Sequence, residues 1–315
     1  MTAARKNAVA GFSYVLAATV LWALVPISVK KVSVALDAYT ITWVRFAVSS
    51  VLLLIFAHIS GNLKRIRRSD YRLIILAGAG ICLNYVLYTI GIKLTTASAG
   101  NVVVNFEAIW LVILGHLWLK DRLSGMKLFG TLITFAGVFA AIWNGEGFAA
   151  LVKSDYFIGN MLIVACAPFW AVYGIAQKIL VERGVAVSTA LACIFAAAAV
   201  FTFPFMAAGF KVTQRLDVSV WVWLFVLVVL STLGAYALMA KGFKTLDAST
   251  AGVITCVLPI LTIFAARIFL AEVVTPSVFV GAGLVVAGMI IIGHAEAVSH
   301  DRAQHRCIAK HSSVD

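Results

Sequence analysis

Charged residues are scarce in this sequence. Asp, Glu, Lys and Arg together make up 12% of its 315 residues, whereas hydrophobic residues make up 63%. A soluble globular protein carries about 25% charged residues, which it needs to cover its surface. The deficit excludes a water-soluble protein, a disordered chain and a coiled coil of this length. It predicts an integral membrane protein.

The sequence also lacks the patterns of most enzyme and metal sites. Neither a Gly-x-Ser-x-Gly elbow nor a phosphate-binding loop is present. The cysteines have no metal-ligand spacing and four of them lie in apolar runs, so they argue for neither a metal nor a disulfide. We therefore expect no enzyme, no metal, no cofactor and no step driven by ATP. The five cysteines are Cys82, Cys166, Cys193, Cys256 and Cys307.

Apolar runs of about 20 residues, the length that crosses a bilayer core as an α-helix, recur along the chain. Short polar connections separate them, and after Gly293 we expect a loosely ordered tail, residues 294–315. The sequence predicts an all-α integral membrane protein with ten transmembrane helices. These are Ala10–Val29, Ala38–Ile59, Leu73–Ile92, Ser98–Trp118, Gly125–Trp143, Phe157–Gln177, Ser188–Phe210, Val218–Ala240, Ser249–Leu270 and Pro276–Gly293.

Positive charges are distributed unevenly between the connections. An even number of spans places both termini on one side. That side collects seventeen Lys and Arg residues, including the run from Lys64 to Arg72, against six on the other. Because positive loops stay in the cytoplasm, we predict a multi-pass protein of the inner (plasma) membrane with both termini cytoplasmic. The net charge of +12 then indicates contact with membrane lipid, not nucleic acid.

The two halves of the chain resemble each other. We interpret residues 1–145 and 146–293 as two homologous repeats of five spans each. At a shift of 148 residues, Lys30 aligns with Lys178. At a shift of 151, the matches that apolar composition does not explain are Tyr85/Tyr236, Gly91/Gly242, Lys93/Lys244, Ser98/Ser249 and Asp121/Glu272.

Five spans is an odd number, so tandem copies must lie in the membrane with opposite orientations. Inverted repeats of this kind are common in secondary transporters, where a two-fold axis lies in the membrane plane. When the two halves exchange conformations, an inward-open state becomes an outward-open one. The predicted fold of two inverted five-helix repeats therefore favours transport by alternating access.

Several short motifs follow one another along the spans. They are Leu21-Trp22-Ala23, Trp43-Val44-Arg45-Phe46, Leu83-Asn84-Tyr85, Ser98-Ala99-Gly100 and Asn105-Phe106-Glu107. With Asp121 and Glu272 at the ends of spans four and nine, nearly the whole chain resembles the EamA-like branch of the drug/metabolite transporter superfamily. It departs from the family pattern at Ala108, where a proline often follows the Glu, and at Lys120-Asp121, which replaces Gly-Glu. The resemblance implies a ten-span metabolite or drug transporter, frequently an exporter, with a cavity between the repeats.

Spans one and six carry helix-loosening residues at equivalent positions. Pro26 lies four residues after Trp22, and Gly174 lies four residues after Trp170. Interrupted helices at matching positions indicate a transporter site, because an interruption exposes backbone carbonyls to a cavity. We predict that both spans bend around the substrate and that Trp22, Trp170 and Tyr173 stack on it. The alternative is packing kinks, with the tryptophans at lipid or helix contacts.

Glu107 and Arg45 are ionisable residues inside predicted spans. Counted from Ser98 and Ala38, they lie ~13 Å and ~11 Å along their helices, near the bilayer midplane. An ionisable group at this depth costs several kcal/mol unless it is paired, hydrated or neutralised. Three interpretations remain open. Glu107 binds a proton or substrate, Glu107 and Arg45 form a structural ion pair, or Arg45 extends to the lipid interface.

Further polar residues lie in spans three and four. Asn101 and Asn105 share a helical face, and Glu107 lies about 200° around the helix from Asn105. An unbent helix would therefore direct either the asparagines or Glu107 into a cavity, but not both. Polar groups inside spans can also hydrogen-bond neighbouring helices. The candidate substrate-binding residues are Trp22, Asn84, Tyr85, Tyr88, Asn101, Asn105, Trp170 and Tyr173.

The ends of spans four and nine are also polar. Ser98 and Ser249 begin these spans, where the helix N-terminus could hold a carboxylate or the serines could merely cap the helices. Asp121 and Glu272 end them, and we expect anchoring or interfacial salt bridges there. Small residues in spans five and ten permit close packing, either in the repeat core or in a homodimer. These are Gly130, Gly137, Gly281 and Gly288.

These features predict a secondary transporter of small organic metabolites such as amino acids, working as an exporter by alternating access. Trp, Tyr, Asn and one carboxyl would form a small, partly apolar site. The proton gradient or the substrate's own gradient would supply the energy. The alternative is a lipid or lipid-carrier flippase of the same fold, which would need a lateral opening between spans. A non-transporting scaffold is disfavoured because it has no need of a buried Glu107.

Overall fold

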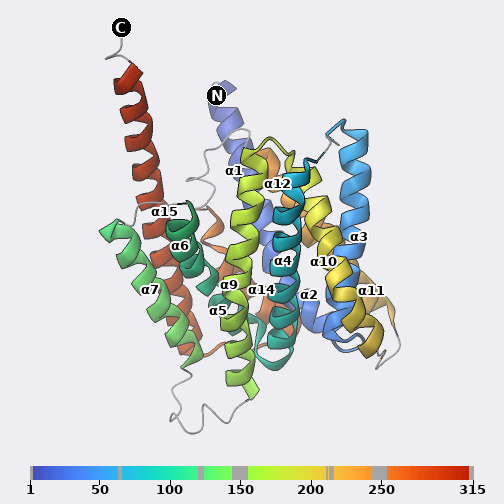
Figure 1. Ribbon diagram of the computed structural model, residues 1–315. Coiled ribbons are helices and arrows are strands. Elements are labelled where there is room, and N and C mark those ends of the chain that lie inside the picture. The colour runs from blue at the N-terminus through green and yellow to red at the C-terminus, as the bar shows by residue number, and fades with distance from the viewer. Residues whose placement is uncertain are drawn as a thin grey trace.

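The computed structural model describes residues 3–62, 66–119, 124–143, 155–210, 212, 216–242 and 254–311. These residues form a bundle of helices with both chain ends at the same end of the bundle (Figure 1). The predicted all-α fold class is confirmed. The helices, which include the π-helical segment η1, are α1 (Ala3–Ala23), α2 (Val25–Val32), α3 (Ala38–Ile59), α4 (Arg68–Leu94), α5 (Ala97–Val104), α6 (Phe106–Leu119), α7 (Gly125–Ile142), α9 (Asp155–Glu182), α10 (Val187–Gly209), α11 (Val218–Phe225), η1 (Val226–Gly234), α12 (Ala235–Gly242), α14 (Leu258–Leu270) and α15 (Pro276–His311).

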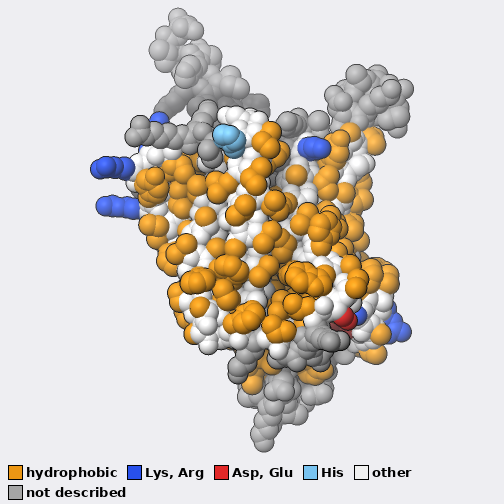
Figure 2. Space-filling view, turned by 90° about the vertical axis from the view of Figure 1, so that its right-hand side faces the viewer, with side chains coloured by type: hydrophobic (Ala, Val, Ile, Leu, Met, Phe, Trp, Pro, Cys, Tyr) orange, Lys and Arg blue, Asp and Glu red, His pale blue; other side chains and the backbone are white. Residues whose placement is uncertain are grey.

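The described helices account for ten membrane spans. Nine continuous or interrupted helices are long and apolar enough to cross a membrane, and Leu258–Leu270 is a shorter apolar helix. Spans one to five comprise α1 to α7, and spans six to ten comprise α9 to α15. Figure 2 shows apolar side chains over the broad middle of one face, with charged side chains near its margins. That distribution is the one a lipid-embedded surface requires.

The last helices of the two halves, α7 and α15, pack with their backbones in close approach. A Cβ atom added to Gly130 would lie 2.8 Å from the carbonyl oxygen of Gly288, and one added to Gly137 would lie 2.8 Å from that of Gly281. Only glycine permits this approach. The sequence did not decide whether these glycines pack within the repeat core or in a homodimer contact. In the structure they lie between the two halves of one chain.

Span one is interrupted as predicted, but span six is not. α1 ends at Ala23 and α2 begins at Val25, with Pro26 in the first turn of α2, where its missing N–H costs nothing. No break is present at Gly174, because α9 remains α-helical from Asp155 to Glu182. Glycine keeps its N–H and so does not interrupt the hydrogen-bond ladder. Pro168, which lies inside α9 six residues earlier, does remove one hydrogen bond of that ladder.

Spans four and nine are interrupted at positions that correspond in the repeat. α5 ends at Val104, and α6 begins at Phe106 after Asn105. In span nine a turn at Cys256 and Val257 precedes α14. At the shift of 151 residues, Asn105 corresponds to Cys256. The matching interruptions of a repeat transporter therefore lie in spans four and nine, instead of one and six.

The C-terminal segment also differs from the prediction. α15 continues to His311 instead of giving way to a loosely ordered tail after Gly293. No proline or glycine follows Gly293 before His311, so nothing in the sequence ends the helix there. Ser249 and Asp121 lie outside the described residues.

Candidate functional site

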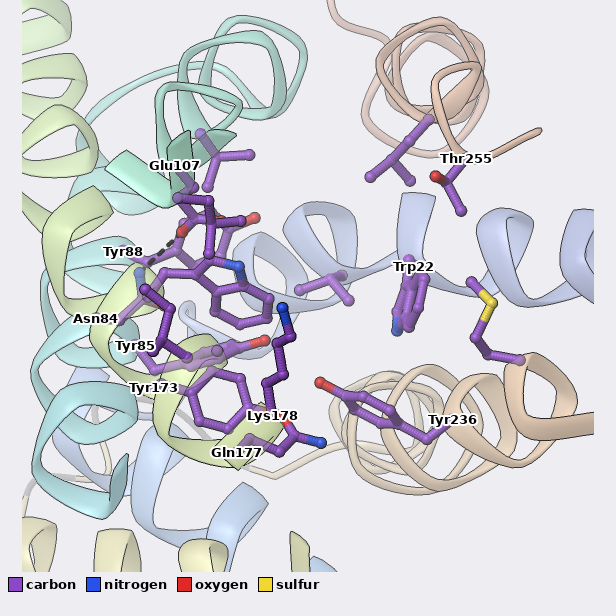
Figure 3. A pocket seen from close by; sticks show the side chains of 18 of the residues that line it. Trp22, Asn84, Tyr85, Tyr88, Glu107, Tyr173, Gln177, Lys178, Tyr236 and Thr255 are labelled. Carbon is purple, nitrogen blue, oxygen red and sulfur yellow. Dashed lines mark hydrogen bonds between the residues drawn. The ribbon is translucent and has the colours of Figure 1, made fainter. Parts of the chain in front are cut away.

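A cavity of about 630 Å³ lies between the two halves of the bundle (Figure 3). Residues from spans one, three and four form one part of its wall, and residues from spans six, eight, nine and ten form the other. The lining residues are Trp22, Val25, Asn84, Tyr85, Tyr88, Asn101, Val104, Glu107, Leu111, Gly115, Trp170, Tyr173, Gly174, Ile175, Gln177, Lys178, Tyr236, Met239, Thr255, Leu258 and Met289.

The interruption of span four decides which of its polar side chains face the cavity. Asn101 precedes the interruption and Glu107 follows it, and both line the cavity. Asn105, at the interruption, is not among the lining residues. Its amide donates instead to the carbonyl oxygens of Asn101 (2.6 Å) and Val102 (3.3 Å). The sequence argument that Asn101 and Glu107 could not share a cavity assumed an unbent helix, and the helix is broken.

Glu107 is held by a neighbouring span. Asn84 on α4 donates through Nδ2 to Oε1 of Glu107 (2.8 Å) and to the carbonyl oxygen of Cys166 on α9 (3.0 Å). Among the described residues, no Lys or Arg forms a salt bridge with Glu107. The thiol of Cys166 also donates to the same oxygen (4.0 Å). The carboxylate therefore lines the cavity with an amide and a thiol as its donors, and no described cation forms a salt bridge with it.

Arg45 does not line the cavity and does not pair with Glu107. Its side chain is 3% exposed, so it lies inside the bundle and not at the lipid interface. Its Nε donates to Oγ1 of Thr232 in η1 (2.9 Å), and its guanidinium carbon lies 4.2 Å from the centre of the Tyr85 ring. A cation over an aromatic face attracts that face. Arg45 thus packs on the ring of Tyr85, which lines the cavity, without lining the cavity itself.

Aromatic side chains form much of the cavity wall. The ring centres of Trp170 and Tyr173 are 5.1 Å apart, and those of Tyr85 and Trp170 are 6.4 Å apart. Trp22 and Tyr236 meet edge to face at 5.7 Å. Contacts of this kind fix the orientation of the rings and leave apolar faces available to a ligand.

Seven of the eight predicted substrate-binding residues line the cavity, and Asn105 does not. The prediction missed Tyr236 and Lys178, although the repeat contains a signal for both. Tyr236 corresponds to Tyr85, which was predicted, and Lys178 corresponds to Lys30. Lys178 has a half-exposed side chain (52%) near the end of α9, on the side of both termini. It marks the end at which the cavity approaches the surface.

Ser98 and Glu272 lie away from the cavity, at the opposite end of the bundle. The backbone N–H and hydroxyl of Ser98 donate to Oε2 of Glu272 (3.1 Å and 2.9 Å). The N-terminus of α5 therefore does hold a carboxylate, but one that belongs to the protein itself. Glu272 faces another helix and not the lipid headgroups.

The chain has ten apolar spans in two halves, and a cavity between the halves contains a partly buried carboxylate. These features define a multi-pass membrane transporter. The model of the EamA-like transporter family matches residues 9–143 and 157–293. The chain therefore belongs to that family.

Relatives match over most of their length. An uncharacterised transporter of Haemophilus influenzae is 26% identical over 92% of this chain and 97% of its own. The uncharacterised inner membrane transporter YhbE of Escherichia coli is 25% identical over 92% of this chain and 94% of its own. A crystal structure with 16% sequence identity superposes with a TM-score of 0.63, covering 91% of this chain and 96% of that one. At this identity the superposition supports the fold alone.

Proposed function

We propose that this transporter exports small amphipathic metabolites such as amino acids by alternating access. The observation that carries the proposal is the composition of the cavity. Glu107 is the one acidic side chain among its lining residues, which are otherwise mainly aromatic and aliphatic. A cavity of about 630 Å³ with few polar groups suits a small organic solute.

The polar groups of the cavity suit the two charged ends of an amino acid. The carboxylate of Glu107 can accept the ammonium group. Asn101 also lines the cavity, and its buried Oδ1 has no hydrogen-bond partner among the described residues. Lys178 lies at the other end of the cavity, toward the surface, and can attract a carboxylate. The tryptophan and tyrosine rings between them supply apolar and cation–π contacts.

The position of Lys178 indicates how a cytoplasmic solute would reach the cavity. Lys178 lines the cavity with a half-exposed side chain, near the end of α9 on the side of the bundle that carries both termini. The distribution of Lys and Arg predicts that this side is cytoplasmic. A solute would therefore enter the cavity from the cytoplasm and leave after the opposite end opens.

Glu107 also suits coupling to protons. It can hold either a proton or a cationic group, and one would displace the other. Exchange of a substrate ammonium for a proton at one carboxylate would link outward movement of the substrate to inward movement of a proton. The requirement is that the carboxylate has no permanent cationic partner, which agrees with its amide donor Asn84.

Transport by purified protein in sealed vesicles tests this function. We expect labelled amino acids to move at a rate that depends on pH. Glu107→Gln keeps the size of the side chain but cannot ionise, so it should flatten the pH dependence and lower the rate by about tenfold or more. Asp217→Asn, at the start of α11 and away from the cavity lining, is the control and should behave as the wild type. Unchanged pH dependence in Glu107→Gln would remove the coupling role. Phospholipid scrambling without solute flux would support a flippase instead.

A further inference from the structure

Glu272 connects the two halves of the chain at the distal end of the bundle, defined as the end opposite both termini (Figure 1). Its carboxylate accepts hydrogen bonds from the backbone N–H of Ala97 (2.7 Å), the backbone N–H of Ser98 (3.1 Å) and the hydroxyl of Ser98 (2.9 Å). Ala97 and Ser98 begin α5 in the first half. Glu272 lies between α14 and α15 in the second half.

This contact joins complementary groups. The first N–H groups of a helix have no partner within the helix and carry partial positive charge. The hydroxyl of Thr96 accepts from the N–H of Ala99 (3.0 Å), which leaves the N–H groups of Ala97 and Ser98 for the carboxylate. Both of these residues are buried, at 0% and 2% exposure. If Glu272 left, these buried donors would lose a charged acceptor.

The backbone around Glu272 directs it toward α5. Ala271 adopts the left-handed conformation (φ 52°) that ends α14. The next residue, Glu272, has its carbonyl oxygen within 3.4 Å of Nη1 of Arg267. α2 packs against both α5 and α14. Segments of α2 and α5 and the end of α14 therefore lie together at this end of the bundle.

The same segments extend to the cavity at their other ends. α5 leads to the interruption at Asn105 and then to Glu107, and α2 begins at Val25, three residues after Trp22. Toward the distal end Val32 and Ala35 are fully buried, so the chain is closely packed there. Movement of α5 away from the α14–α15 connection would therefore open the distal end and displace the cavity wall at the same time.

We propose that Glu272 is a positioning residue whose contact with the N-terminus of α5 keeps the distal end closed, and that this contact breaks each time that end opens. The inference rests on the proposed function, because it assumes alternating access. It assigns the closed state of the distal end to one charged contact between the halves.

Distances between spin labels test the proposal without any substrate. Lys93 near the end of α4 and Val273 beside Glu272 are both exposed, so labelled cysteines at these positions report the separation across the contact. The full-length protein is used with its native cysteines replaced by serine. We expect mainly short distances in the parent. Glu272→Gln should raise the ratio of long to short distances by about tenfold, as expected when one charge-assisted contact is lost.

Two variants control this measurement. Ser98→Ala removes only the hydroxyl donor and should raise the ratio by about twofold to threefold, because the backbone donors remain. Asp217→Asn changes another carboxylate, one that caps its own helix α11 at the N–H of Val220 (2.9 Å), and should leave the distances unchanged. Equal distributions in the parent, Glu272→Gln and Ser98→Ala, with all three folded, would overturn the proposal.

A cross-link tests whether the contact must break. A double variant, Ser98→Cys with Glu272→Cys, places one thiol on each side of the contact. Because cysteine is shorter than the glutamate it replaces, the two thiols are joined with a short bifunctional reagent that forms a reducible disulfide with each of them. Cross-linking should stop transport in vesicles, and reduction should restore it. Full transport by protein shown to be cross-linked would overturn the proposal even if Glu272→Gln failed to fold. If the distances shift as expected but the parent protein transports no solute, the role of the Glu272 contact in closure is supported and the proposed transport function is overturned.

Discussion

The two halves of the protein meet in two contrasting ways. Between α7 and α15 they meet backbone to backbone, with Gly137 and Gly281 leaving no room for even a methyl group. In the cavity wall, Trp22 of the first half and Tyr236 of the second meet edge to face. Beside the cavity α4 and α9 also pack closely, since a Cβ added to Gly80 would lie 2.9 Å from the carbonyl oxygen of Phe169. The glycine contacts leave no space between the helices, whereas the aromatic wall encloses one.

The contrast indicates which contacts can change during transport. Alternating access requires some contacts between the halves to persist while others separate. Two closely packed helices resist gradual deformation, because a small separation would lose many contacts at once. We therefore expect the α7–α15 contact to persist, and the cavity wall and the Glu272 contact to change. Variants of the first kind should lower stability, and variants of the second kind should alter transport.

The largest effect on stability is expected from Gly137→Ala. The added Cβ would lie 2.7 Å from the backbone nitrogen of Val285 and 2.8 Å from the carbonyl oxygen of Gly281, so α7 and α15 must move apart. We expect a melting temperature lower by roughly 5–10 °C, measured by thermal unfolding in detergent. Gly283→Ala on α15 is the matched control, because no described atom lies within 4 Å of its added Cβ. Equal melting temperatures for the two variants would show that the contact is not closely packed.

A smaller effect on stability, but a clear one on transport, is expected from Trp22→Ala. Trp22 lines the cavity and also packs against two apolar clusters. Its loss should raise the KM for transport by about fivefold to tenfold and should lower the melting temperature less than Gly137→Ala does, because Trp22 is only partly buried. Trp221→Ala removes an exposed tryptophan (56%) from the outer surface and serves as the control. If the two variants had the same KM, Trp22 would have no role in binding.

Much of the fold follows from composition alone. The span predicted as Ala38–Ile59 coincides with α3, because apolar length and flanking polar residues determine both ends. Asp37 marks the start of that helix, since its carboxylate accepts from the N–H groups of Tyr39 (2.9 Å) and Thr40 (3.0 Å). Local chemistry of this kind is readable from a sequence.

The interruption of span four is not readable in the same way. Asn105 resembles any polar residue inside a span, and Ala108 lacks the proline that would have indicated a break. The side-chain amide of Asn105 donates to the carbonyl oxygens of Asn101 and Val102. Whether its side chain bonds its own helix or a neighbouring one depends on the surrounding helices. For this reason the sequence missed the interruptions of spans four and nine, although Asn101 and Glu107, on either side of the break in span four, were among its candidate residues.

Contacts between distant segments are likewise absent from the local pattern. Glu272 and Ser98 are far apart in the sequence, and their contact needs the whole bundle to form. The repeat alignment nevertheless paired each of them with a counterpart, as it paired Tyr236 with Tyr85. Internal symmetry therefore predicts which residues are equivalent, but not which partner each one contacts in a given state.

The smallest effect is expected from Gly174→Ala, which tests the remaining difference between spans one and six. α9 is continuous at Gly174, and an added Cβ would lie 3.4 Å from a methyl group of Leu111, an ordinary contact with a flexible side chain. Since alanine favours a helix over glycine by up to about 1 kcal/mol, we expect an equal or slightly higher melting temperature and a transport rate within about twofold of the wild type. A protein that is more stable but transports poorly would mean that α9 must bend at Gly174 in another state, as span one does before Pro26. Thermal unfolding and vesicle transport on the same preparation distinguish a static helix from one that bends only when the distal end opens.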